Sequence, residues 1–145
     1  MAITTAMCNS FKEELLGGVH DLDTDSIKVA LIKASPTGTY GASTTNYSDV
    51  TGNSDEATGT NYTAGGQVLD TATITLSGST AFVDFADEVF TSVTISADGC
   101  ILYNASQSNK AIAVFDFGGT VTSTNGDFTI VFPTADSSSA VIRIA

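Results

Sequence analysis

Short apolar runs dominate the second half of this chain, from Gln67 to Ala145. They are about four to eight residues long and recur at roughly ten-residue intervals, which is typical of short strands joined by turns. A single strand cannot bury its own apolar face, so such a chain must fold as two packed sheets or as a closed barrel. Turn residues close the successive runs at Ser77-Gly78-Ser79, Asp98-Gly99, Asn104 to Asn109, Gly118-Gly119, Asn125-Gly126 and Pro133 to Ser139.

The pattern predicts an all-β fold: an antiparallel β-sandwich or jelly roll of about eight strands with one short N-terminal helix. The runs at 100–104 and 111–117 are apolar on both sides, which indicates central strands. The last run reaches the final residue, so we expect the C-terminus to be tied into a sheet. The predicted strands are 26–34, 67–76, 81–85, 89–95, 100–104, 111–117, 128–132 and 139–145.

The one predicted helix runs from Ala6 to Leu16 and ends at Gly17-Gly18, where glycine permits the left-handed cap. Its apolar residues fall in a stripe about 100° wide. Two interpretations stay open: the stripe covers an open end of the sandwich, or it docks on another subunit. We therefore divide the chain into an N-terminal helical arm, 1–25, and a single β-sandwich domain, 26–145. The stripe consists of Met7, Cys8, Phe11 and Leu15.

Residues 35–66 form a long segment rich in Thr, Ser, Gly and Asn, with Tyr40, Tyr47 and Tyr62 spaced along it. Loops longer than about 15 residues are uncommon in compact domains and are usually functional or disordered. The tyrosines supply rigid contact area, so we expect the loop to pack on something, either its own sheet or a partner. The hypothesis for partner contacts combines these tyrosines with three helix residues: Met7, Phe11 and Leu15.

A second apolar face is predicted on two central strands, and something must cover it. The 35–66 loop could do so within one chain, and a partner subunit could do so in a dimer or trimer. The residues of this face are Ile101, Tyr103, Ile112 and Val114.

The charge and the residue inventory argue against several classes of function. A formal net charge of -11 repels phosphate backbones and anionic membrane surfaces, so nucleic acid and membranes are not expected partners. His20 is the only histidine and no Gly-x-Ser-x-Gly elbow is present, so no catalytic residue is predicted and the protein is expected not to be an enzyme.

Metal and cofactor sites are not predicted either. Cys8 and Cys100 are too few and too far apart for a metal knuckle, and we expect two buried free thiols. The carboxylates of residues 21–25 resemble the start of a calcium loop, but Ser26 and Ile32 stand where glycine and glutamate are needed. A polar turn is the main interpretation of that segment, with a divalent-ion site as the alternative.

The chain resembles small virion structural proteins of tailed bacteriophages, of the capsid decoration or cement type. The resemblance covers nearly the whole chain. Its most characteristic part is Glu56-x-x-Gly59-x-x-Tyr62-Thr63-x-Gly65-Gly66. The other parts are Asn9-Ser10-Phe11-Lys12-x-x-Leu15-Leu16 leading to His20, Lys28-x-Ala30-Leu31-Ile32-Lys33, Tyr40-Gly41, Asn46-Tyr47, Phe82-x-Asp84-Phe85 and Ile142-Arg143-Ile144.

The resemblance implies a non-enzymatic protein on the outer capsid surface, made in the host cytoplasm. It implies that the protein bridges and stabilises major capsid subunits, and that it is itself a homo-oligomer. The family brings no cofactor and no functional residues that could be assigned here. The alternative interpretation is a tail or cell-surface adhesin or carbohydrate-binding module that uses the tyrosine-bearing loop as its platform.

Overall fold

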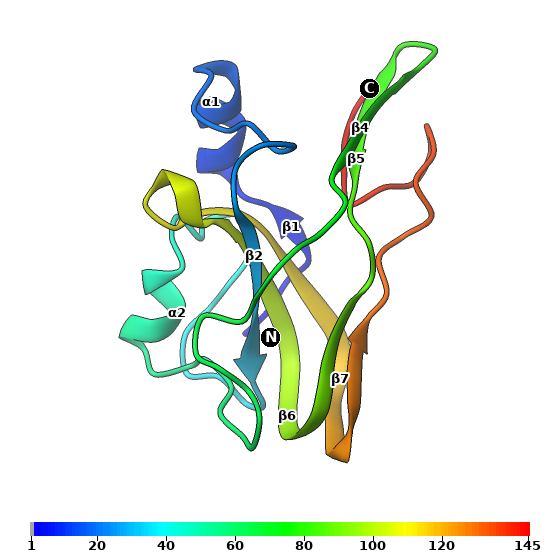
Figure 1. The fold of residues 1–145 in the computed structure, drawn as a ribbon. Coiled ribbons are helices and arrows are strands. Elements are labelled where there is room, and N and C mark those ends of the chain that lie inside the picture. Colours follow the sequence, from blue (N-terminus) through cyan, green and yellow to red (C-terminus); the bar gives the residue numbers. More distant parts are fainter. Residues whose placement is uncertain (1) are drawn as a thin grey trace.

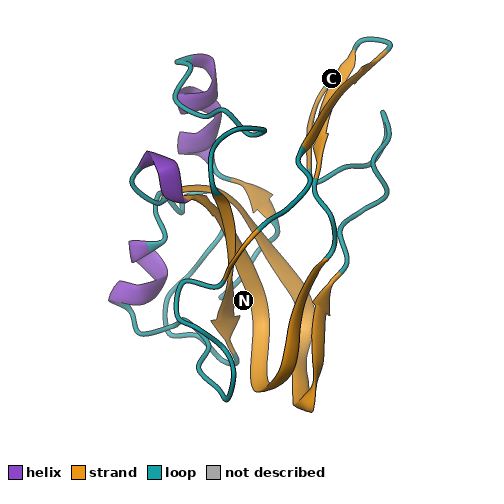
Figure 2. Cartoon of the chain, viewed as in Figure 1, coloured by secondary structure: helices purple, strands orange, loops and turns teal. Residues whose placement is uncertain are grey.

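The structure, a computed structural model, describes residues 2–145 and has the expected all-β architecture with a short N-terminal helix. It is an antiparallel β-sandwich built from two sheets (Figures 1 and 2). No helix within residues 2–145 is long and apolar enough to cross a membrane. The strands are β1 (Ala6–Met7), β2 (Ile27–Lys33), β3 (Gln67–Val68), β4 (Thr73–Ser77), β5 (Thr80–Asp84), β6 (Glu88–Asn104), β7 (Lys110–Ile130) and β8 (Ile142–Ile144).

The larger sheet has the strand order β1-β7-β6-β2-β3, with β6 and β7 at its centre as their apolar runs predicted. The two edge strands, β1 and β3, are only two residues long. β2 pairs with β6 from Ile27↔Asn104 to Lys33↔Ala97 and confirms the strand predicted at 26–34. A short 3-10 helix, η1 (Ala105–Gln107), connects β6 to β7.

β6 and β7 pair with each other as one long hairpin. This two-stranded ribbon bends sharply, so that its two halves face each other (Figure 1). The sequence pattern predicted four separate strands here, with turns at 98–99, 118–119 and 125–126. That prediction is wrong in detail, because the chain continues through these points as strand. The ladder shifts register between Phe90 and Val93 and between Ala97 and Gly99. Such bulges bend a strand without reversing it, so turn-forming residues mark the bend.

The smaller sheet has the order β4-β5-β8 and projects away from the larger one (Figure 2). The run predicted as one strand at 67–76 is divided between the sheets, because β3 pairs with β2 whereas β4 pairs with β5. Between them Thr71 has a positive φ of 56°, where the chain changes direction. β8 pairs with β5, so the expectation that the C-terminal run joins a sheet is confirmed.

The N-terminal segment packs on the larger sheet. The helix α1 (Asn9–Leu16) begins later than predicted, because Ala6 and Met7 pair with β7 as strand β1. Cys8 and Phe11 are fully buried in the core, and the Cys8 N–H donates to the Ile112 carbonyl. Half of the apolar stripe, Cys8 and Phe11, therefore packs on the sandwich, whereas Met7 and Leu15 are only half-buried. A second short helix, α2 (Ser48–Gly52), lies within the long loop.

Candidate functional site

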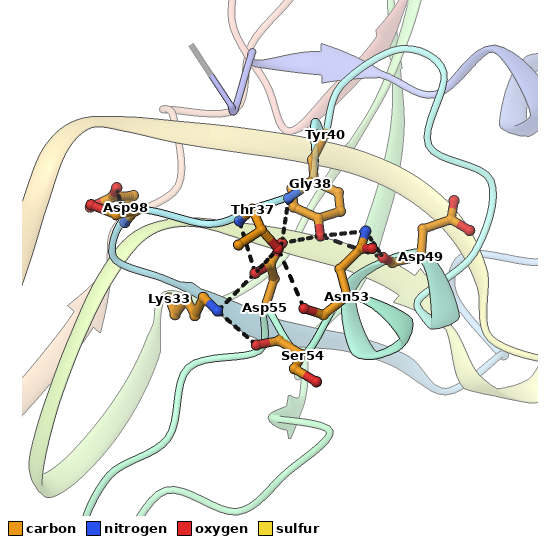
Figure 3. Close-up of polar contacts among 10 residues, drawn as sticks. Lys33, Thr37, Gly38, Tyr40, Asp49, Asn53, Ser54, Asp55 and Asp98 are labelled. Atoms are coloured by element: carbon orange, nitrogen blue, oxygen red, sulfur yellow. Dashed lines mark hydrogen bonds and ion pairs between the residues drawn. The ribbon is translucent and has the colours of Figure 1, made fainter.

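A buried carboxylate organises the first half of the long loop (Figure 3). Asp55 has no exposed surface and accepts hydrogen bonds from the Gly38 N–H at 2.7 Å and the Tyr40 hydroxyl at 2.5 Å. The Thr37 N–H donates to it at 3.0 Å, and the Lys33 ammonium lies 2.9 Å from Oδ1. Because a buried charge is tolerated only when it is paired and hydrogen-bonded, this set of partners explains its position.

The hydrogen bonds also keep Asp55 ionised. Burial alone would raise its pKa, but the donors of Thr37, Tyr40, Gly38 and Lys33 outweigh burial and hold the pKa well below its usual range. In turn, burial and the neighbouring carboxylate raise the pKa of Tyr40 to about 12. A carboxylate that is ionised at every ordinary pH and surrounded by internal donors is a structural anchor, not a proton donor for catalysis.

A second acid, Glu56, organises the other half of the loop. Its carboxylate accepts hydrogen bonds from the Tyr47 hydroxyl, from the Tyr62 hydroxyl at 2.9 Å and from the Gly65 N–H at 2.6 Å. The Tyr62 hydroxyl also accepts from the Leu31 N–H of β2 at 2.9 Å. Burial raises the pKa of Tyr62 and of Tyr47 above the ordinary range, so both remain neutral donors.

Two glycines of the Glu56–Gly66 motif also help to attach the loop to β2 and β6. Gly66 has a positive φ of 71°, and a Cβ there would lie 1.7 Å from the Val29 carbonyl oxygen. A Cβ on Gly59 would lie 2.0 Å from the Thr94 carbonyl oxygen. Only glycine allows the loop backbone to come this close to β2 and β6. The most characteristic part of the sequence is therefore explained by packing within the chain.

The loop covers the second apolar face of the larger sheet. Tyr47 stacks on Tyr103 with ring centroids 4.5 Å apart, and the Tyr103 hydroxyl donates to the Gly65 carbonyl at 2.6 Å. All four residues predicted to need a cover are buried within one chain: Ile101, Tyr103, Ile112 and Val114. The 35–66 loop, and not a partner subunit, therefore covers this face. An oligomer would have to use a different surface.

His20 joins the helix, the polar turn and the end of β6. Its Nε2 lies 2.7 Å from a Glu14 carboxylate oxygen and its Nδ1 lies 3.0 Å from the Asn104 amide nitrogen. That amide nitrogen also donates to Asp25 at 2.7 Å, while the amide oxygen accepts from the Ser106 N–H. These two contacts fix the orientation of the Asn104 amide, so its nitrogen is the donor to His20 Nδ1. Nδ1 is therefore the acceptor, and the imidazole proton lies on Nε2. His20 is buried, so this cluster is a structural connector.

Residues 21–25, which carry three carboxylates, form a compact polar turn. The Asp25 N–H donates to the Asp21 carbonyl at 2.8 Å, and the Asp21 N–H donates to an Asp25 carboxylate oxygen at 3.1 Å. Within residues 2–145, no three His, Cys, Asp or Glu side chains are grouped so that they could hold a metal ion. Cys8 and Cys100 are free and fully buried, as predicted, and burial raises the pKa of each thiol to about 12.

An apolar cleft that is open to solvent lies between the end of α1 and the smaller sheet. It has a volume of about 310 Å³. The register of the smaller sheet places two apolar rows on one face, Ile74–Val83–Ile142 and Leu76–Ala81–Ile144. The second row is the more exposed, with Leu76 at 71% and Ile144 at 53%. The cleft is lined mainly by these strands and by Leu15, Gly18, His20, Asp21 and Leu22.

The six residues of the partner-contact hypothesis do not form one surface. Phe11 and Tyr40 are buried, so neither offers surface to a partner in this structure. Met7, Tyr47 and Tyr62 are half-buried against the core. Leu15 is the member of the set that lines the cleft. Sequence reasoning missed the remainder of the cleft.

No protein-family model, curated protein or solved structure matches the chain.

Proposed function

We propose that this protein is a non-enzymatic structural component of a tailed-phage particle, a capsid decoration protein that bridges and stabilises major capsid subunits. The observation that carries the proposal is the open apolar cleft between α1 and the smaller sheet. Of the residues that line it, Ile74 and Ile144 are each 53% exposed. Apolar groups gathered in this way on a chain with a net charge of -11 are typical of a surface that binds another macromolecule.

The mechanism requires burial of apolar surface and no chemistry. If the cleft covers apolar side chains of two neighbouring capsid subunits, separating those subunits exposes that surface again. Each 100 Å² of apolar contact contributes about 2.5 kcal/mol, and the contribution is repeated at every site on the shell. The rigid attachment of α1 through Phe11 and of the long loop through Asp55 and Glu56 holds the sandwich in one shape for repeated docking.

The adhesin alternative rested on the tyrosines of the long loop. The hydroxyls of Tyr40, Tyr47 and Tyr62 all donate to carboxylates of the same chain, and Tyr40 is 1% exposed. A carbohydrate platform needs exposed rings and free polar groups. We therefore favour the capsid function over the adhesin function.

Copy number in purified particles tests the proposal. A decoration protein is present in hundreds of copies, in a fixed ratio to the major capsid protein, when the two are compared by quantitative mass spectrometry. A handful of copies per particle would assign the protein to the tail, and its absence from particles would refute the proposal.

The binding surface is tested by variants on particles. Ile144→Asp should abolish association of the purified protein with shells that lack it, because it places a charge among the apolar side chains that line the cleft. The matched control is Val68→Asp, at a residue that is 47% exposed and does not line the cleft. Equal binding by both variants would exclude the cleft as the capsid contact.

A further inference from the structure

We propose that β4 is a homodimer edge: the β4 strands of two copies pair antiparallel about a two-fold axis at Thr75 and join the two small sheets into one six-stranded sheet. The inference does not depend on the capsid function. It concerns the free edge of the smaller sheet, which projects from the body of the molecule (Figures 1 and 2).

The argument begins with the contrast between sheet edges. The larger sheet ends in β1 and β3, each of two residues, which offer almost no free backbone. β8, at the other edge of the smaller sheet, has three residues and carries Arg143. β4 is a five-residue edge strand, exposed along its whole length. Proteins protect edge strands by shortness, charge, proline or bulges, and β4 has none of these features. An unprotected edge of this kind is suited to pairing with another strand.

Charge identifies the partner as a second copy. The chain carries 16 Asp and Glu residues against 5 Lys and Arg, so two copies repel each other over most of their surface. Residues 71–83, which contain β4, the turn and all of β5 except its last residue, Asp84, include no charged residue. Two copies can therefore approach through the β4 edge without placing acidic side chains opposite one another.

The hydrogen-bond pattern of the hairpin allows this pairing. The turn at Gly78-Ser79 has two residues and Gly78 has a φ of 60°, so Ser77 and Thr80 form the closing pair. Bonding then alternates along the ladder, and the N–H and C=O groups of Ile74 and Leu76 point to the free edge. In a dimer centred on Thr75, Ile74 lies opposite Leu76 of the second copy, and these two residues exchange both hydrogen bonds.

The side chains of β4 are also self-complementary about Thr75. The strand reads Thr-Ile-Thr-Leu-Ser, so reversal about its centre places polar against polar and apolar against apolar residues. Ile74 and Leu76, 53% and 71% exposed, would cover each other on the apolar face. The facing pairs Thr75 with Thr75 and Thr73 with Ser77 suit hydroxyl contacts across strands. This is the isologous geometry that a two-fold axis requires.

Disulfide trapping tests the register. Thr75→Cys places two thiols at a non-hydrogen-bonded pair, where Cα atoms are about 4.5 Å apart and a disulfide can form. We expect most of the oxidised protein to run as a covalent dimer on a non-reducing gel. Thr73→Cys is the matched control, since its two copies would lie roughly 13 Å apart. Native Cys8 and Cys100 are fully buried and do not interfere. Equal cross-linking of both variants would refute the register.

Charge exchange tests the interface itself. Analytical ultracentrifugation of the unmodified protein at about 100 µM should show a dimer, and Thr75→Lys should raise the dimer Kd at least about tenfold because like charges would face each other. Mixing Thr75→Lys with Thr75→Glu should restore the dimer. Circular dichroism establishes that each variant is folded. A folded, unmodified protein that stays monomeric, or a Thr75→Lys protein with an unchanged Kd, overturns the proposal. If the protein stays monomeric, the free edge of β4 would be available to a strand of a different protein.

Discussion

The long loop, 35–66, and the projecting β4–β5 hairpin, 73–84, differ in how their polar and apolar residues are exposed. The loop is polar and almost free of regular structure, yet it contains the buried Asp55 and the half-buried Glu56 and is attached to β2 and β6 by hydrogen bonds and close backbone contacts. The hairpin is regular and its β4 strand carries apolar residues, yet β4 is exposed along its whole length. Polarity along a sequence therefore does not distinguish what lies inside from what lies outside. What matters is whether each buried polar group finds a partner.

The largest effect should come from removing the anchor of the loop. Asp55→Ala leaves the donors of Thr37, Gly38 and Tyr40 without their acceptor and the Lys33 ammonium without its ion-pair partner. We expect the free energy of unfolding in urea to fall by about 3–5 kcal/mol. The control Asp23→Ala, at an exposed acid, should change it by less than about 0.5 kcal/mol. A loss below about 1 kcal/mol at Asp55 would mean that the loop is held by other contacts.

A single hydroxyl should matter less than the whole anchor. Tyr40→Phe keeps the buried ring but removes a donor to the Asp55 carboxylate. Hydrogen bonds to charged groups contribute about 1.5–3 kcal/mol, and we expect a loss of that size in urea denaturation with an unchanged m-value. An unaltered midpoint would show that the Asn53 amide, which donates to the Tyr40 oxygen at 3.2 Å, or water takes over the vacated position.

Acid should weaken the loop before it affects the hairpin. The folded-state pKa of Asp55 lies below its unfolded value, so its contribution is complete above about pH 4 and is lost as pH falls further. One such group changes the free energy of unfolding by at most about 1.4 kcal/mol per pH unit. Urea titrations between pH 5 and pH 2 measure this slope, and Asp55→Asn should flatten it. If the free energy of unfolding of Asp55→Asn changes with pH as steeply as that of the unmodified protein, other carboxylates cause the acid sensitivity.

The smallest effect on folding should come from the exposed strand. Leu76→Ser removes a side chain that is 71% exposed and should change the free energy of unfolding by no more than about 0.5 kcal/mol, measured in dilute protein where monomers dominate. The same change should weaken the dimer, since Leu76 faces Ile74 of the second copy. A large loss of monomer stability would show that the hairpin is part of the core and would remove the contrast with the loop.

The sequence by itself determined the all-β class, the central position of the strands around Leu102 and Val114, and the burial of both thiols. These follow from local hydrophobic pattern, because a run that is apolar on both sides can satisfy both faces only inside a sheet. The sequence also showed that 35–66 must pack on something, since three tyrosines are too many for a solvated linker.

Only the tertiary structure decided what the loop packs on and which surface stays open. Asp55 and Glu56 resemble ordinary surface acids in the sequence, because their donors come from residues that only folding brings together, such as Lys33 and Tyr62. Turn residues at 98–99 and 118–119 became bends within β6 and β7, since a bulge and a turn use the same backbone conformations. The free edge of β4 depends on strand order, and strand order is a property of the whole fold that no local pattern encodes.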